Sequence, residues 1–132
     1  MKYLKKILII LTIAIAFISC NNDDGNDSIT PLSIVGNWNL TATLADPGDG
    51  SGTFQPASGK SLNFTDQGVV NCNVSFCFGS LTQATSTGTY DVMTTTIDVE
   101  NCIGTYIFID ADTIEISHLC IEPCGERYVR VN

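Results

Sequence analysis

The fold class is decided by the stretch Ile34-Val35-Gly36-Asn37-Trp38-Asn39-Leu40-Thr41-Ala42-Thr43-Leu44. Its even-numbered residues are all apolar or glycine, and its odd-numbered residues after Val35 are Asn or Thr. Side chains along a β-strand point alternately to the two faces of a sheet, so this period of two predicts a strand with one buried face. We therefore expect a strand of about eleven residues at the start of an all-β domain.

The same alternation recurs downstream of this stretch. Leu62 and Phe64 precede the turn residues Asp66-Gln67-Gly68, and an alternating apolar run completes a hairpin at Val70, Cys72, Val74 and Phe76. Further short strands are predicted at residues 88–92, 96–100, 105–109, 113–119 and 127–131, with a turn at 110–112. About eight such strands predict a barrel or a sandwich, and a closed barrel is favoured because closure leaves no exposed sheet edge.

The first twenty residues have the layout of an export signal. Three lysines lead into an apolar run at residues 7–18, in which Thr12 is the one polar residue, and Ser19 then precedes Cys20. The apolar run would span roughly 18 Å as a helix, which is too short for a membrane crossing. The ordinary secretory peptidase requires a small residue at the third-last position before the cleavage site, and Phe17 occupies that position here.

The segment Phe17-Ile18-Ser19-Cys20 resembles the cleavage box of bacterial lipoproteins, with its small residue directly before the cysteine. We therefore predict a signal peptide at residues 1–19 and acylation of Cys20 by chains such as palmitate. Each buried CH₂ contributes about 0.8 kcal/mol, so two or three acyl chains would hold the protein on a membrane. Residues 20–32 are polar, acidic and without any periodic pattern, which predicts a flexible tether.

The acidic composition of the chain limits the kinds of molecule that it can bind. The chain has 6 basic and 14 acidic residues, and loss of the signal peptide would remove three of the basic ones. Such an acidic surface repels phosphate backbones, which argues against nucleic-acid binding. The membrane is therefore a partner through the lipid alone. The pair Asp23-Asp24 resembles an export signal of some Gram-negative lipoproteins, which favours the outer membrane and exposure at the cell surface.

A family resemblance covers most of the chain after the tether. Gly36-Asn37-Trp38 looks like the Gly-x-Trp signature of lipocalins. The loop at 46–52, the triplet Gly88-Thr89-Tyr90 and the ending Cys120-Ile121-Glu122-Pro123-Cys124 are similar to a group of lipocalin-like lipoproteins. This resemblance implies that residues 33–132 form a lipocalin-like, antiparallel up-and-down barrel of about eight strands.

The same resemblance implies roles for particular residues. Gly36 and Trp38 would close one end of the barrel under an arginine of the last strand, with Arg130 as the first candidate and Arg127 as the second. Five aromatic residues would line the ligand site in the interior or open mouth of the barrel: Phe64, Phe76, Tyr90, Tyr106 and Phe108. The chain is shorter than true lipocalins and lacks an evident C-terminal helix, so it could enclose a small cavity or none.

The cysteines indicate an oxidising compartment. With Cys20 acylated, five remain, so at least one stays unpaired in a monomer. Cys72 is the candidate for the free thiol, because it shares an apolar strand face and would act as a small buried side chain. The other four allow three pairings. We favour Cys77 with Cys102 and Cys120 with Cys124, since the second pair would close a tight loop.

Other chemistry has weaker support. His118, Cys120 and Cys124 are possible metal ligands, but a structural disulfide and one histidine explain them more simply outside the cytoplasm. The loop at 46–52 holds two carboxylates among glycines yet lacks the regularly spaced oxygen ligands of a calcium loop. One histidine and few other general bases argue against catalysis. We therefore predict no catalytic residues, no metal and no cofactor.

Two functional hypotheses follow. The first is a lipid-anchored barrel that binds a small apolar or amphipathic ligand. The second is a structural or protein-interaction module of the cell envelope whose core is filled by side chains. An open apolar pocket of roughly 300 Å³ or more would favour the first hypothesis, and a solid interior would favour the second.

Overall fold

The computed structural model describes residues 32–80 and 82–131. The predicted signal peptide, Cys20 and the predicted tether up to residue 31 lie outside these residues. The described residues contain no helix with the length and apolar character needed to span a membrane.

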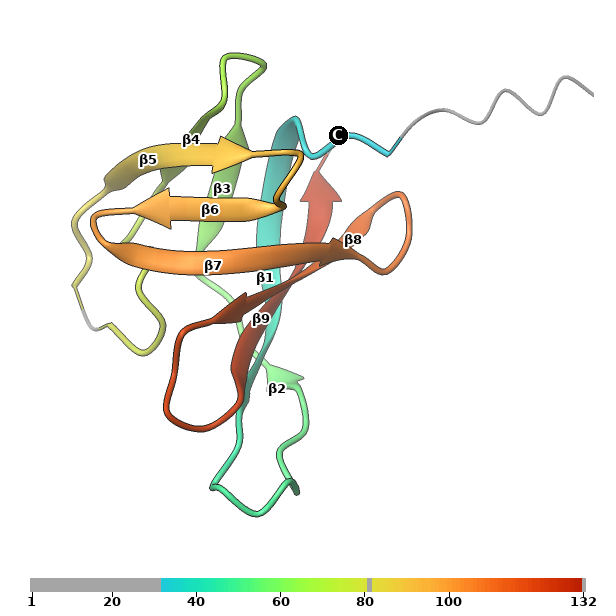
Figure 1. The fold of residues 1–132 in the computed structure, drawn as a ribbon, viewed down its shortest axis with the longest axis vertical. Coiled ribbons are helices and arrows are strands. Elements are labelled where there is room, and N and C mark those ends of the chain that lie inside the picture. Colours follow the sequence, from blue (N-terminus) through green and yellow to red (C-terminus); the bar gives the residue numbers. More distant parts are fainter. Residues whose placement is uncertain (1–31, 81, 132) are drawn as a thin grey trace, which may run out of the picture. The chain divides into compact units, whose positions relative to one another are not determined.

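The domain is all-β, as predicted, and its strands follow one another around a closed barrel (Figure 1). Eight strands form the barrel wall, and every neighbouring pair is antiparallel. These strands are β1 (Gly36–Ala45), β3 (Ser61–Phe64), β4 (Val69–Cys72), β5 (Ser86–Asp91), β6 (Thr96–Val99), β7 (Cys102–Phe108), β8 (Thr113–His118) and β9 (Cys124–Val131).

The first and last strands close the barrel. β1 pairs with β9 along its whole length, from Asn37 opposite Val131 to Ala45 opposite Cys124. The other edge of β1 is shared, because its first half pairs with β3 and its second half pairs with the two-residue strand β2 (Gln55–Pro56). The predicted up-and-down barrel is therefore confirmed, with β2 as a short addition to its wall.

A β-bulge interrupts the alternation of β1. Leu40 lies opposite Tyr128 and Ala42 lies opposite Arg127, so Thr41 is an extra residue between the two pairs. Its hydroxyl donates to the carbonyl oxygen of Arg127 at 3.1 Å. Beyond the bulge the strict alternation expected as far as Leu44 is lost, and that side chain is only half-buried. The predicted single buried face therefore ends at Leu40.

The two ends of the barrel differ, and we name them by their loops. The rim is the end that carries the segment 32–35 and the turns at 65–68, 92–95 and 109–112. The base carries the β4–β5 segment after residue 72, the turn at 100–101 and the loop at 119–123. The beginning of the described chain and its C-terminal end lie side by side at the rim (Figure 1).

The interior is filled by side chains. The largest fully buried ones are Trp38, Tyr128, Phe64, Phe76, Leu62, Ile97, Ile114, Ile116, Val70 and Val99. They come from β1, β3, β4, β6, β8 and β9 and from the β4–β5 segment, and they belong to one continuous apolar cluster. The core therefore occupies the space in which larger barrels hold a ligand.

Both favoured disulfides are confirmed. Cys77 pairs with Cys102, which joins the β4–β5 segment to the start of β7. Cys120 pairs with Cys124 and closes the loop between β8 and β9. Cys72 is free and buried on the inner face of β4. Both bridges lie at the base, where the first fastens the long segment at 73–85 to the barrel wall and the second closes the short loop at 119–123.

Candidate functional site

An open apolar pocket lies at the rim and has a volume of about 590 Å³. We call it the rim pocket. Its wall is made by the segment before β1, the turn between β5 and β6, and the end of β7: Leu32, Ser33, Ile34, Val35, Val92, Thr95, Tyr106, Ile107 and Phe108. Seven of these nine side chains are apolar or aromatic. The pocket therefore has a mainly apolar surface, to which Ser33 and Thr95 add hydroxyl groups.

The five aromatic residues predicted to line a ligand site are divided by the fold. Tyr106 and Phe108 border the rim pocket, and their ring centroids are 5.8 Å apart. Phe64 packs edge-on against Tyr90 at 5.1 Å, away from that pocket. Phe76 is fully buried at the base. The five residues therefore do not line one interior site. Tyr106 and Phe108 border the rim pocket, and the other three pack elsewhere in the barrel.

Trp38 lies beneath the segment before β1, at the rim end of the barrel, and its side chain is fully buried. Its indole Nε1 donates to the carbonyl oxygen of Ile34 at 2.8 Å. The guanidinium of Arg130 lies over the indole ring, 4.2 Å from the centroid, and its Nη1 donates to the carbonyl oxygen of Val35 at 2.8 Å. These contacts hold the segment before β1 across the end of the barrel, and so they place one wall of the rim pocket.

Gly36 makes the approach of that arginine possible. A Cβ atom at this position would lie 2.8 Å from Nη1 of Arg130, and the φ angle of Gly36 is +134°, which side chains rarely adopt. Arg127, the second candidate, lies elsewhere. Its guanidinium covers the ring of Phe54 at 4.2 Å and pairs with Glu115 at 2.6 Å on the outer wall.

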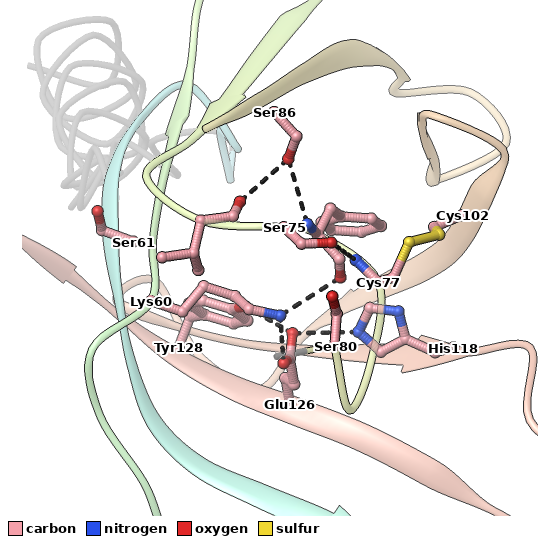
Figure 2. A network of polar contacts seen from close by, with 12 residues as sticks. Lys60, Ser61, Ser75, Cys77, Ser80, Ser86, Cys102, His118, Glu126 and Tyr128 are labelled. Carbon is pink, nitrogen blue, oxygen red and sulfur yellow. Dashed lines mark hydrogen bonds and ion pairs between the residues drawn. A yellow bond between two sulfur atoms is a disulfide. The ribbon is translucent and has the colours of Figure 1, made fainter. Parts of the chain in front are cut away.

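A buried polar network lies at the base, and sequence reasoning missed it (Figure 2). The carboxylate of Glu126 points into the barrel and accepts from three side chains. These are Nζ of Lys60 at 2.6 Å, Nε2 of His118 at 3.1 Å and the hydroxyl of Tyr128 at 2.6 Å. Lys60 also donates to the carbonyl oxygen of Phe76 at 3.3 Å. We call these four side chains (Lys60, His118, Glu126 and Tyr128) the basal network.

The electrostatics of the basal network favour an ionised Glu126. Burial by itself would raise the pKa of this carboxyl, but the hydrogen bond from His118 and the charge of Lys60 outweigh burial, so the pKa is lowered. Burial and the neighbouring carboxylate raise the pKa of Tyr128 well above its ordinary value, which keeps the phenol neutral. The side chains of His118 and Glu126 are each 4% exposed. The network therefore acts as a satisfied buried ion pair.

One signal in the sequence could have located part of this network. Glu126 shares the strand parity of Tyr128 and Arg130, so it had to face inward if those two did. A buried carboxylate then requires a partner, and Lys60 is the one lysine after the predicted signal peptide.

The residues considered as metal ligands are used otherwise. Cys120 and Cys124 are bonded to each other. The carboxylate of Asp46 accepts from the backbone N–H groups of Gly48, Gly50 and Gly52, and these bonds lower its pKa. Among residues 32–80 and 82–131, no group of three or more His, Cys, Asp or Glu side chains is placed to hold a metal ion.

Neither a model of a known protein family nor a curated protein matches the sequence.

Proposed function

We propose that the chain is a lipid-anchored lipoprotein of the outer membrane whose barrel binds a small apolar or amphipathic ligand in the rim pocket. The anchoring part rests on residues 1–20, where an apolar run and a small residue precede Cys20. The binding part rests on one observation, the open and mainly apolar rim pocket.

The size and wall of the rim pocket support ligand binding. Its volume of about 590 Å³ falls within the usual range of small-molecule sites. Leu32, Val92 and Ile107 on its wall are 55%, 61% and 55% exposed. Covering such side chains contributes roughly 25 cal/mol for each Å² of apolar surface removed from water. A ligand in this pocket would therefore gain free energy without any change in the filled core.

The form of the rim pocket favours an amphipathic ligand. Because the core is filled, a ligand would lie over the exposed side chains of Leu32, Val92 and Ile107, with one side open to water. The hydroxyls of Ser33 and Thr95 lie on the flanks of the pocket. An apolar chain or ring with one polar end fits this surface, since its polar end stays hydrated while the rest covers the apolar wall.

The anchoring part is tested by Cys20→Ala in the full chain. The parent is expected to incorporate labelled palmitate and to enter the detergent phase on phase separation. The variant should lose both properties, because it lacks the acylated thiol. A variant that still incorporates palmitate and enters the detergent phase as before would overturn the lipoprotein assignment.

The binding part is tested by native mass spectrometry of the full chain released from its own envelope. The parent should carry a small-molecule adduct. Val92→Asp, which places a charge on the exposed wall of the rim pocket, should lose it. Ile103→Asp is the matched control, because Ile103 is an exposed residue of β7 outside that pocket and its variant should keep the adduct. A parent without an adduct, or equal adducts on both variants, would contradict ligand binding at the rim.

A protein-interaction module of the envelope is the second candidate, and a different surface favours it. Leu119 directly precedes the loop closed by Cys120 and Cys124 and is 81% exposed, and Ile121 within that loop is fully exposed. Exposed apolar side chains on a rigid loop are typical of contacts with a protein partner. A co-purifying protein that is lost from Ile121→Asp and kept by Val92→Asp would favour this candidate over the ligand binder.

A further inference from the structure

A shallow polar groove crosses the outer wall of the barrel on the side of β1, β3 and β4. It comprises a pocket of about 440 Å³ and an adjoining one of about 260 Å³ that share Asn39, Ser61 and Asn73. We call it the asparagine groove, after the five asparagines of the larger pocket: Asn37, Asn39, Asn63, Asn71 and Asn73.

The strand register places these amides in a row. Asn37 lies opposite Asn63, which lies opposite Asn71, which in turn lies opposite Thr87 on β5. Adjacent strands are about 4.8 Å apart, so the row presents an amide or hydroxyl group at each step across four strands. These short side chains stand where long charged residues are common on an outer sheet face, and they leave the surface hollowed.

Hydrogen bonds within the row hold the amides in place. Nδ2 of Asn63 donates to Oδ1 of Asn37 at 2.8 Å, and the hydroxyl of Thr87 donates to Oδ1 of Asn71 at 3.1 Å. Nδ2 of Asn37, Oδ1 of Asn63 and Nδ2 of Asn71 have no partner among the described residues. The row therefore offers a donor, an acceptor and a donor in succession, on side chains that are already ordered.

The larger pocket of the groove carries no formal charge. Its wall contains no Asp, Glu, Lys or Arg, although the chain as a whole has a net charge of -8. In the adjoining pocket, Lys60 turns its amino group to Glu126 in the basal network. An anionic ligand would find no free cation in the groove, and a cationic ligand would find no carboxylate.

We propose that the asparagine groove binds a neutral oligosaccharide. Sugar hydroxyls both donate and accept hydrogen bonds, so neighbouring hydroxyls can pair with the alternating donors and acceptors of the row. Val131 is 42% exposed and adds apolar surface to the wall, which suits the C–H face of a sugar ring. A nucleic acid would need cations, and an added peptide strand would need a free edge, which barrel closure removes there. This site is separate from the rim pocket and does not depend on the proposed function.

The test is saturation-transfer difference NMR of the full chain with maltotriose and with triacetylchitotriose. At least one of these neutral trisaccharides should receive saturation from the parent protein. The double variant Asn63→Ala/Asn71→Ala should weaken this binding by about tenfold or more, because it removes an acceptor and a donor of the row. The matched control is Thr105→Ala/Ser117→Ala, an exposed polar pair facing each other on β7 and β8, and it should bind like the parent.

A second variant distinguishes loss of the binding site from loss of the fold. Asn71 is exposed, and Asn71→Asp keeps the shape of the side chain while it replaces the free donor with an anion. It should also lose binding. Lack of transfer from the parent to both trisaccharides, equal loss in the control pair, unchanged binding by Asn71→Asp, or equal binding of the anionic trigalacturonate would each overturn the proposal.

Discussion

The guanidinium of Arg130 on the last strand lies 4.2 Å from the centroid of the Trp38 ring on the first strand. Besides this contact, it donates to the backbone carbonyl oxygens of Ser33 and Val35. Between these two residues, Ile34 is buried and accepts from the Trp38 indole. One side chain from the end of the chain therefore fastens the segment that leads into the barrel, and this segment forms a wall of the rim pocket.

Arg130→Lys should lower the free energy of unfolding by about 2 to 3 kcal/mol, because an ammonium cannot keep both backbone hydrogen bonds and the flat contact with the indole. Urea unfolding followed by fluorescence measures this directly, since Trp38 is the only tryptophan of the chain. Arg127→Lys is the control. Arg127 is 39% exposed and its pair with Glu115 lies on the surface, so we expect a loss of about 1 kcal/mol or less. Equal losses in the two variants would contradict this role of Arg130.

The stability of the fold should depend on the ionisation of Glu126. Its pKa in the folded chain is lowered from the ordinary value of 4.5, because hydrogen bonds from His118 and the charge of Lys60 outweigh the effect of burial. A lowered pKa means that the carboxylate stabilises the fold above about pH 4.5 and that this contribution is lost as the pH falls through the folded-state pKa. Urea unfolding between pH 7 and pH 3 should show this decline.

In Glu126→Gln, the acid-dependent decline should be shallower, with the remainder coming from carboxyls such as Asp46 and Asp91, whose pKa values are also lowered. At neutral pH the variant should lose about 3 kcal/mol or more, because the nearly buried Lys60 is left without its counter-charge. Glu115→Gln, which breaks the more exposed pair with Arg127, should cost about 1 kcal/mol or less. An unchanged pH dependence in Glu126→Gln would refute this account of the basal network.

Cys72 should be unreactive until the barrel unfolds. Its thiol is 3% exposed, and burial raises its pKa, so the nucleophilic thiolate is scarce and shielded. Iodoacetamide followed by peptide mapping should leave Cys72 unmodified in the native chain and modify it in guanidinium without reductant. Cys77, Cys102, Cys120 and Cys124 should remain unmodified in both conditions, because they are disulfide-bonded. Modification of native Cys72 would show that the inner face of β4 is accessible.

Gly88→Ala should destabilise the barrel more than Gly104→Ala. A Cβ atom at Gly88 would lie 2.1 Å from the backbone oxygen of Asp98 on the paired strand, so the backbones of β5 and β6 would have to separate. At Gly104 the nearest atom is a methyl group of Ile116 at 2.8 Å, which is part of a side chain and can shift. We expect a loss of about 3 kcal/mol or more for Gly88→Ala and about 1 to 2 kcal/mol for Gly104→Ala, measured by urea unfolding. The reverse order would contradict the close packing of β5 against β6.

Local patterns predicted much of the fold. The alternation from Ile34 to Leu40 and the turns at 66–68 and 110–112 involve residues a few positions apart, so the chain's own periodicity reveals them. The pairing of Cys120 with Cys124 is local in the same sense. The bulge at Thr41 escaped this reasoning, because an extra residue is defined only against the partner strand, 86 positions away at Arg127.

The candidate sites were harder to predict than the strands. Phe64 and Phe76 are aromatic and inward-facing, as expected, but whether such side chains border a cavity or fill it depends on the volume that the whole barrel encloses. The asparagine groove depends on register in a similar way. Asn37, Asn63 and Asn71 form a row because three strands align them, and no spacing along the chain indicates that alignment.

The sequence by itself determined the all-β class, the turns at 66–68 and 110–112, the choice of Cys72 as the buried thiol and the hypothesis that Cys20 carries a lipid. Each of these rests on neighbouring residues, because strand periodicity, turn chemistry and a cleavage box all act over a few positions. Only the tertiary structure decided that the core is filled, that Glu126 is buried between Lys60 and His118, and that the open apolar surface lies at the rim. These features depend on how eight strands close around a common interior, where residues far apart in the chain compete for the same space.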